Sequence, residues 1–276
     1  MQTIVITGAT SGLGRLATLE LARRGARVLA VARDPAKADR LRADTGAEVF
    51  LADFTRLADV RRVAREITAR HDHVDVLVNN AGLHAFTPRT TPDGHPEMVA
   101  VNYLAPWTLT RDLLPALRRA PAARIVNVAS EAARRHGGLR LPEDLTETVP
   151  FTARGSSAHY GRSKLLGIMF TLELARRLTG TGVTATCLNP GFNTTGLGRE
   201  LPFAATLERL LTRLSIGDPT RGADLIVRLA VDPGFDGHTG GYYSVPGARL
   251  IRPAPPAGDP ELQARLWRET ERLLDG

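Results

Sequence analysis

The chain of 276 residues is poor in several residue types, and each shortage argues against a class of protein. Its single cysteine, Cys187, has no partner for a disulfide within the chain, which argues against a small disulfide-stabilised secreted fold. Apolar residues never form a run of membrane-spanning length, and residues 2–6 resemble a strand rather than a cleavable leader. We therefore predict a soluble, cytoplasmic protein with no membrane partner.

Lysine is nearly absent, although the chain is basic. Of its 36 lysine and arginine residues only Lys37 and Lys164 are lysines, so each of these suggests a chemical reason. The formal charge is +7, but the basic residues are scattered as pairs such as Arg23 and Arg24 and never form a long run. This scatter argues against nucleic-acid binding and favours an acidic, phosphate-bearing ligand.

Short apolar runs alternate with longer helical patterns along the chain. Strands are expected near 2–6, 27–32, 47–51, 74–79, 124–129, 183–188 and 241–245. Helices are expected over 13–24, 56–70, 96–119, 158–179, 200–213 and 220–231, and from Asp259, where a capping residue precedes Pro260. The runs 74–78 and 125–128 are nearly all apolar, as strands covered on both faces must be. The pattern predicts an α/β doubly wound Rossmann-type parallel sheet of about seven strands, with helices on both faces, in a single domain over 1–276.

A glycine-rich turn follows the first expected strand. Thr7 and Gly8 are followed by Gly12 and Gly14, and then by an amphipathic helical pattern. A turn of this kind exposes backbone amides and the positive end of a helix, which suit a diphosphate. The spacing of the glycines differs from the common dinucleotide motif, so a plain connection between strand and helix stays open.

The end of the second expected strand carries the signal for cofactor choice. Ala32 and Arg33 stand where a ribose-binding residue is expected, and a guanidinium there suits a 2′-phosphate. A charge-assisted bond of this kind is worth roughly 1.5 to 3 kcal/mol, or about 10 to 150-fold in affinity. Arg33 therefore favours NADP(H), with a solvated surface arginine as the alternative.

Polar residues follow other expected strands. Asn80 and Ser130 stand at two strand ends, and Tyr160 and Lys164 have the i, i+4 spacing that places both on one helix face. A phenol is a weak acid near neutral pH, and a neighbouring ammonium is expected to lower its pKa. This pairing gives Lys164 a chemical reason, although such pairs also arise without function.

Taken in order, these pieces resemble the short-chain dehydrogenase/reductase family over nearly the whole chain. The matching residues are Thr7-Gly8-x3-Gly12-x-Gly14, Asn79 to Gly82, Asn102, Ser130, Tyr160-x3-Lys164 and Pro190-Gly191. The resemblance implies that Tyr160 is the acid/base, Ser130 binds the carbonyl oxygen, Lys164 holds the nicotinamide ribose and tunes Tyr160, and Asn102 orders a proton-relay water. It implies cofactor contacts by Gly8, Thr10, Ser11, Gly12, Leu13, Gly14, Arg33, Asp53, Phe54, Asn80, Ala81, Gly82, Tyr160, Lys164, Pro190, Gly191 and Thr195. No metal ligand is expected.

Within the family the chain is similar to the retinol dehydrogenase-like branch, on residues 173–177, the long gap from Ser130 to Tyr160 and residues 262–267. That branch mostly uses NADP(H). The chain departs from the family at Asn193 and Ala129 and shows no N-terminal membrane helix, so retinoid is not the substrate we expect. The family analogy implies a homodimer or homotetramer.

We predict a reductase of ketones or aldehydes that moves a hydride between NADP(H) and a small organic substrate. The preference for arginine over lysine is typical of GC-rich genomes, whose enzymes of this kind often modify secondary metabolites. Substrate choice is expected to lie in segments 131–156 and 192–215, which follow strand ends. A catalytically silent cofactor-binding scaffold or redox-sensing regulator is the alternative, and a lyase or epimerase that uses bound cofactor transiently is the third reading.

Overall fold

The computed structural model describes residues 1–191 and 219–275. Its sheet has eight strands in the order β3-β2-β1-β4-β5-β6-β7-β8. Seven are parallel, and β8 pairs antiparallel with β7. In chain order the strands are β1 (Thr3–Thr7), β2 (Arg27–Ala32), β3 (Glu48–Leu51), β4 (Val76–Asn79), β5 (Ala123–Val128), β6 (Val183–Asn189), β7 (Tyr242–Ser244) and β8 (Arg249–Leu250).

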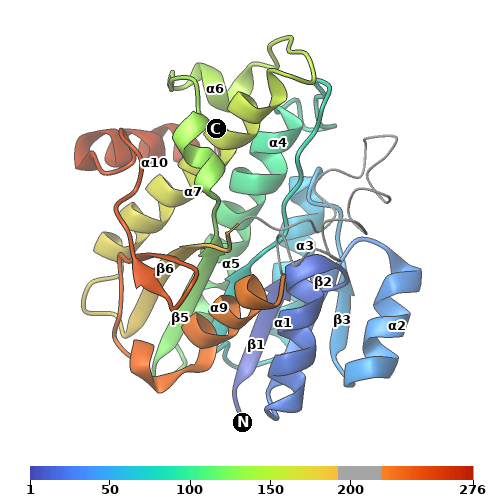
Figure 1. The fold of residues 1–276 in the computed structure, drawn as a ribbon. Coiled ribbons are helices and arrows are strands. Elements are labelled where there is room, and N and C mark those ends of the chain that lie inside the picture. The colour runs from blue at the N-terminus through green and yellow to red at the C-terminus, as the bar shows by residue number, and fades with distance from the viewer. Residues whose placement is uncertain (192–218, 276) are drawn as a thin grey trace.

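Helices cover both faces of this sheet (Figure 1). Helices α1 (Gly12–Arg23), α2 (Pro35–Thr45) and α9 (Pro219–Val231) belong to one apolar layer, in which α1 packs against α9. The opposite layer contains α3 (Leu57–Arg70), α5 (Ala105–Leu117) and α7 (Ser156–Arg177), and α10 (Pro260–Asp275) packs against α7. The prediction of a doubly wound α/β fold is confirmed.

The central strands are buried because both of their faces are covered. Along β1 the side chains of Ile4 and Ile6 enter the α1/α9 layer, whereas Val5 enters the α3/α5 layer. Leu77 and Val78 divide in the same way along β4. This period of two means that a strand covered on both faces must be apolar at nearly every position.

The sequence prediction missed strand β8, helix α2 and the short helix α6 (Glu143–Thr146). Strand β8 has only two residues, too few for any periodicity to show. Helix α2 buries only Ala38 and Leu41, so its apolar pattern is weak, although Asp34 caps it by accepting a hydrogen bond from the Lys37 amide at 3.1 Å. The cap and the proline at its first position were readable signals for this helix.

The single helix expected over 96–119 is interrupted. Short α4 (Glu97–Val99) passes into a π-helical turn over Ala100–Leu104 before α5 begins. The extra residue in such a turn re-aims nearby backbone groups, and π turns are frequent at functional sites. The turn contains Asn102. The helix expected over 200–213 lies outside the described residues.

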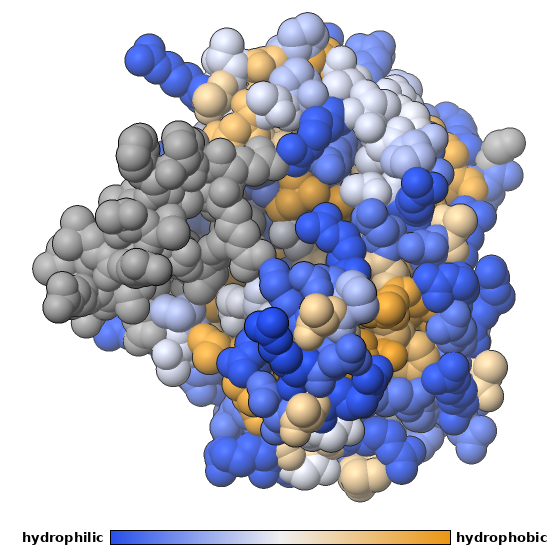
Figure 2. Space-filling model, turned by 90° about the vertical axis from the view of Figure 1, so that its right-hand side faces the viewer, coloured by the Kyte–Doolittle hydropathy of each residue, from blue (hydrophilic) through white to orange (hydrophobic). Residues whose placement is uncertain are grey.

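Few large apolar side chains are exposed on the described surface. The side of the molecule that carries α2 is mostly hydrophilic (Figure 2). In the described ranges the exposed large hydrophobic side chains are Met1, Leu51 and Leu250, and the last two stand on β3 and β8 at opposite ends of the sheet. Single exposed side chains of this kind do not make a docking face. Among the described helices, none is long and apolar enough to cross a bilayer.

Candidate active site

The strand order turns back between β1 and β4, and such a switch point opens a crevice at the carboxyl ends of the strands. The glycine turn lies there. Gly8 and Gly12 have φ of 66° and 53°, a region that favours glycine. A Cβ atom on Gly14 would lie only 2.3 Å from the Gly8 carbonyl oxygen, so the first turn of α1 and the end of β1 touch backbone to backbone.

The residues after β4 hold this turn in place. The Asn80 side chain donates to the Thr7 carbonyl at 2.9 Å, and the Thr7 hydroxyl accepts from the amides of Asn80 and Ala81, each at 3.0 Å. Asn80 thus acts on the shape of the turn, and Ala81 and Gly82 are left to line the space beside it.

A cleft of about 300 Å³ opens beside the glycine turn. The predicted residues that line it are Gly8, Thr10, Ser11, Arg33, Asp53, Phe54, Ala81 and Gly82, and the sequence reasoning missed Asp34, Lys37, Leu83 and Val101. Ser11 is the N-cap residue of α1, and its side chain makes no capping bond. The glycines without Cβ atoms, the start of α1 and the cleft beside them together fit the diphosphate of a dinucleotide.

Lys37 is the most informative of the missed residues. It stands in the first turn of α2, and its Nζ lies 3.7 Å from Asp34 Oδ2. Arg33 and Lys37 are both exposed, line the cleft and stand four residues apart after β2. The scarcity of lysine was the only sequence signal for it, because the helix that carries Lys37 was not predicted.

The opposite end of the crevice lies near β6. Pro190 and Gly191 follow this strand, and a Cβ atom on Gly222 of α9 would lie 2.9 Å from both Leu13 and Pro190. Helix α9 therefore packs closely against both Leu13 and Pro190 at Gly222. The predicted residue Thr195, Asn193 and the whole segment 192–215 lie outside the described residues.

Tyr160, Ser130 and Lys164 meet at the end of β5. Tyr160 lies in the second turn of α7 and is 7% exposed, and Lys164, one turn further on, is 5% exposed. Lys164 Nζ donates to the Val128 carbonyl at 2.9 Å and lies 5.8 Å from the centre of the Tyr160 ring. The i, i+4 prediction for the pair is confirmed by this geometry.

Gly82 joins the cleft to this cluster. It lines the cleft, and a Cβ atom built on it would lie 3.2 Å from Lys164 Nζ and 3.1 Å from Asn102 Oδ1. Because Gly82 has no side chain of its own, this residue leaves the space between the cleft and the ammonium unfilled.

Burial shifts the pKa values of both candidate acid/base groups, Tyr160 and Lys164. It raises the pKa of the Tyr160 phenol to about 12, and the neighbouring Ser130 hydroxyl only partly offsets this effect. Burial also lowers the pKa of the Lys164 ammonium to about 8. The Tyr160 pKa is thus raised overall and not lowered as its pairing with Lys164 suggested, because burial of the phenolate is the largest effect.

Asn102 lies in the π turn, and three hydrogen bonds to residues outside the turn hold its side chain. Its Nδ2 donates to the Leu83 carbonyl and to Ser163 Oγ, both at 2.9 Å, and its Oδ1 accepts from the Leu83 amide at 2.8 Å. A cavity of about 10 Å³ lies beside it, lined by Asn79, Lys164 and other residues, and Asn79 Oδ1 is buried without a partner among the described residues. A space of this size is just large enough for one water.

His84 contacts the candidate acid/base, which no sequence pattern revealed. Its ring stacks on Tyr160 at 4.7 Å and on Phe86 at 4.6 Å, and its Nε2 lies 3.0 Å from Ser156 Oγ. His159 instead stacks on Phe151 at 4.4 Å, in the second half of segment 131–156. His84 therefore supports the Tyr160 ring from the loop after β4.

Segment 131–156 is tied to α7 by a buried ion pair. Arg162 Nη1 lies 2.7 Å from Asp144 Oδ1, and the side chains are 15% and 4% exposed. The same guanidinium donates to the Gly138 carbonyl at 2.9 Å. Two residues from Tyr160, Arg162 thus fixes the loop that follows Ser130.

Comparison with known proteins agrees with this geometry. Residues 2–140 match the family model for short chain dehydrogenase. The chain is 33% identical to human retinol dehydrogenase 13 over 285 residues, which cover 99% of this chain and 84% of the relative. It is 36% identical to a Streptomyces sp. (strain C5) protein provisionally named daunorubicin C-13 ketoreductase DnrU, over 96% of this chain and 90% of that protein.

A solved structure shares the fold. The Pseudomonas aeruginosa RhlG/NADP active-site complex superposes with a TM-score of 0.68 at 25% identity, covering 89% of this chain and 95% of that chain. The short-chain dehydrogenase/reductase family, whose model this chain matches, binds nicotinamide cofactors and catalyses oxidation and reduction. The chain therefore belongs to the short-chain dehydrogenase/reductase family of oxidoreductases, in its retinol dehydrogenase-like branch.

Proposed function

We propose that the protein is an NADP(H)-dependent reductase of ketones or aldehydes, with Tyr160 as its acid/base. The observation that carries this proposal is the position of Gly82, which lines the cleft and approaches Lys164 Nζ without an intervening side chain. A dinucleotide cleft would thereby be joined to a buried phenol and ammonium and to the partly buried Ser130 hydroxyl. The name of the Streptomyces relative, a ketoreductase, supports a carbonyl substrate.

Arg33 and Lys37 would hold the 2′-phosphate that distinguishes NADP(H). Both are cations at the outer end of the cleft, where the glycine turn offers backbone amides for the diphosphate. The NADP in the solved relative agrees with this choice. Asp53 is available near the adenosine end, although its Oδ1 already accepts from the Thr55 amide at 3.0 Å.

The bound nicotinamide supplies or accepts the hydride. In the reductive direction Tyr160 donates a proton to the carbonyl oxygen while the Ser130 hydroxyl donates a hydrogen bond to the same oxygen. A phenol with a pKa of about 12 keeps its proton at neutral pH, so the protein alone holds the acid form that reduction needs. Lys164 then stabilises the phenolate, and the water-sized cavity between Lys164 and Asn102 offers the route by which the proton is replaced.

Calorimetric titration with NADPH and separately with NADH is the first test. We expect NADPH to bind about 10 to 150-fold more tightly, followed by turnover on a panel of small ketones and aldehydes. Binding without turnover on any carbonyl would favour a cofactor-binding regulator. Failure to bind either cofactor would overturn the proposal.

We further propose that residues 1–276 act as one domain in the cytoplasm and that the substrate is a small secondary metabolite. The predicted homodimer or homotetramer would use α7, against which α10 packs in this structure. Light scattering on the purified protein measures its mass directly and tests that prediction.

A further inference from the structure

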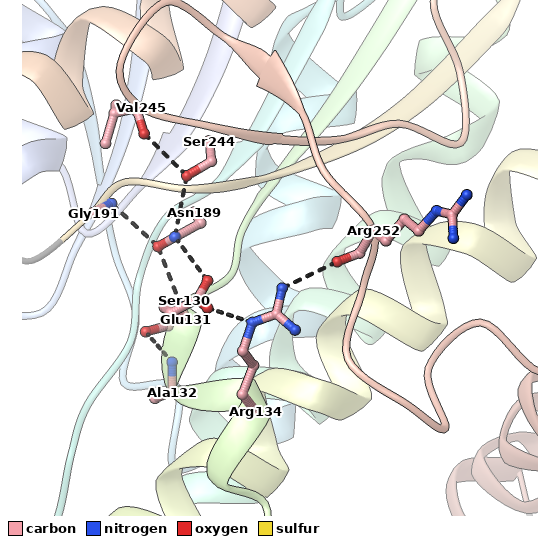
Figure 3. A network of polar contacts seen from close by, with 9 residues as sticks. All are labelled: Ser130, Glu131, Ala132, Arg134, Asn189, Gly191, Ser244, Val245 and Arg252. Atoms are coloured by element: carbon pink, nitrogen blue, oxygen red, sulfur yellow. Dashed lines mark hydrogen bonds and ion pairs between the residues drawn. The ribbon is translucent and has the colours of Figure 1, made fainter.

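The amide of Asn189 lies at the end of β6 and has all four of its hydrogen-bonding positions filled (Figure 3). Its Oδ1 accepts from the Glu131 amide at 3.2 Å and from the Gly191 amide at 3.1 Å. Its Nδ2 donates to Glu131 Oε2 and to Ser244 Oγ, both at 3.2 Å. The residue is 5% exposed, and a buried amide with every site satisfied has a single orientation.

These four bonds join three strand ends. The last paired residues of β5 and β6 are Val128 and Leu188, and one further backbone bond runs from the Ala129 amide to the Leu188 carbonyl at 2.8 Å. Beyond that point the Asn189 side chain continues the link to the backbone of Glu131. Ser244 is the last residue of β7, so the third strand is held by the same amide.

The neighbours of Asn189 are the candidate catalytic segments themselves. Glu131 directly follows Ser130, and Gly191 follows Pro190, two residues that the family resemblance assigns to the nicotinamide end of the cofactor. Gly191 has little room, because its φ is 78° and a Cβ atom built on it would lie 2.7 Å from Val245 Cγ2. A shift of the Asn189 amide is therefore passed on to both segments.

The Glu131 carboxylate decides which way the amide faces. A carboxylate only accepts, so the nitrogen and not the oxygen of Asn189 must point toward Glu131 Oε2. Glu131 Oε1 accepts from Arg134 Nε, and Arg134 donates to the Arg252 carbonyl at 3.4 Å (Figure 3). Reversal of the Asn189 amide would place two acceptors against each other at the Glu131 carboxylate and two donors against each other at the Glu131 and Gly191 amides.

We propose that Asn189 is a positioning residue that sets the spacing between Ser130 and the Pro190–Gly191 segment, with Glu131 fixing the orientation of its amide. The inference rests on the proposed function, in which Ser130 binds the carbonyl, and on the family resemblance, which assigns Gly191 to the nicotinamide end of the cofactor. The spacing between these two segments is then the spacing across which the hydride moves.

Substitutions at Asn189 and Glu131 that move the negative charge from one side chain to the other test this role. Asn189→Asp keeps the acceptor for both backbone amides but sets a carboxylate against Glu131. We expect kcat to fall about 10 to 100-fold, because a misplacement of about 1 Å between reacting groups has an effect of that size. The KM for the carbonyl and the affinity for NADPH should change little, since the groups that bind them remain.

The double variant Asn189→Asp/Glu131→Gln restores the bond with its direction reversed, because the amide introduced at position 131 can donate to the carboxylate introduced at position 189. We expect its kcat to return to within about threefold of wild type, since the same positions are again joined by a hydrogen bond. Glu131→Gln alone should be nearly wild type, as its carbonyl oxygen still accepts from Asn189. Failure of the double variant to recover, in folded protein, would overturn the proposal.

A matched pair of variants covers the case in which Asn189→Asp does not fold. Glu131 and Arg134 are both largely exposed, with side chains 54% and 49% accessible, so truncation of either leaves the core intact. Glu131→Ala removes the acceptor that orients Asn189 and should lower kcat about three to tenfold, whereas Arg134→Ala keeps that acceptor and should not. Equal effects of the two would contradict the proposal.

The emission spectrum of bound NADPH provides a readout that needs no turnover. The nicotinamide is the fluorophore, so we expect Asn189→Asp to change the emission of the complex and the double variant to restore it. An unchanged spectrum in Asn189→Asp would count against the inference. Loss of the proposed function looks different, because wild-type protein would then bind NADPH without reducing any carbonyl, or would not bind it.

Discussion

The two ends of the crevice place their charges in opposite environments. At the outer end Arg33 and Lys37 are exposed, and their charges are solvated before any ligand binds. At the inner end Tyr160 and Lys164 are 7% and 5% exposed, and burial raises the pKa of the phenol and lowers the pKa of the ammonium. Affinity can therefore be adjusted at the outer end with little effect on stability, whereas acid/base chemistry at the inner end is coupled to the free energy of folding.

The largest effect should come from the inner end. Tyr160→Phe removes the proton donor but keeps the ring that stacks on His84. We expect kcat to fall by about 10² to 10⁴-fold, the range for loss of a general acid, while the dissociation constant of NADPH stays nearly unchanged. Steady-state kinetics together with calorimetry measures both quantities. Full activity in this variant would contradict the role of Tyr160 as the acid/base.

Truncation of Arg162, which lies on α7 with Tyr160, tests how much the buried ion pair with Asp144 contributes to stability. Arg162→Ala leaves Asp144 buried without its partner and should reduce the free energy of unfolding by about 3 to 5 kcal/mol. The matched control is Arg15→Ala, whose partner Asp44 is 44% exposed, and its effect should stay below about 1 kcal/mol. Urea unfolding measures both, and similar losses would show that burial does not separate these pairs.

Lys164→Met links chemistry to stability. Because burial lowers the Lys164 pKa from 10.5 to about 8, the folded state carries a penalty of roughly 3 kcal/mol below pH 8. This penalty disappears as the pH rises from 8 toward 10.5, where the unfolded chain still binds the proton and the folded chain does not. We expect the inactive variant to be more stable than wild type at pH 7 and to lose more than half of that advantage by about pH 9.5. Unfolding curves at the two pH values decide the matter, and a difference independent of pH would contradict it.

The smallest effect should come from the outer end. Arg33→Ala should weaken NADPH binding by about 10 to 150-fold and leave NADH binding and the free energy of unfolding unchanged. Lys37→Ala should act in the same direction, because both cations line one end of the cleft. Calorimetry with both cofactors measures the selectivity. An equal loss of NADPH and NADH affinity would remove Arg33 from the 2′-phosphate site.

Local patterns were sufficient wherever short-range physics decides the structure. The seven longer strands, the glycine turn before α1 and the Tyr160–Lys164 pair follow from apolar period, backbone freedom and helix geometry, and all appear in the structure. Helix α2 was missed because it buries too little for periodicity to reveal it, and Lys37 was missed with it. The π turn at Asn102 was also missed, since one extra residue in a helix leaves no trace in an apolar pattern.

By itself the sequence determined the doubly wound sheet, the order of its strand-end motifs and the chemical groups available for a reaction. Only the tertiary structure decided that Gly82 approaches Lys164, that His84 stacks on Tyr160, and that Asn189 joins the ends of β5, β6 and β7. It also decided that burial raises the Tyr160 pKa, where the sequence suggested the opposite. The physical reason is that periodicity and spacing act over a few residues, whereas desolvation and hydrogen bonding depend on groups that the parallel sheet brings together from distant parts of the chain.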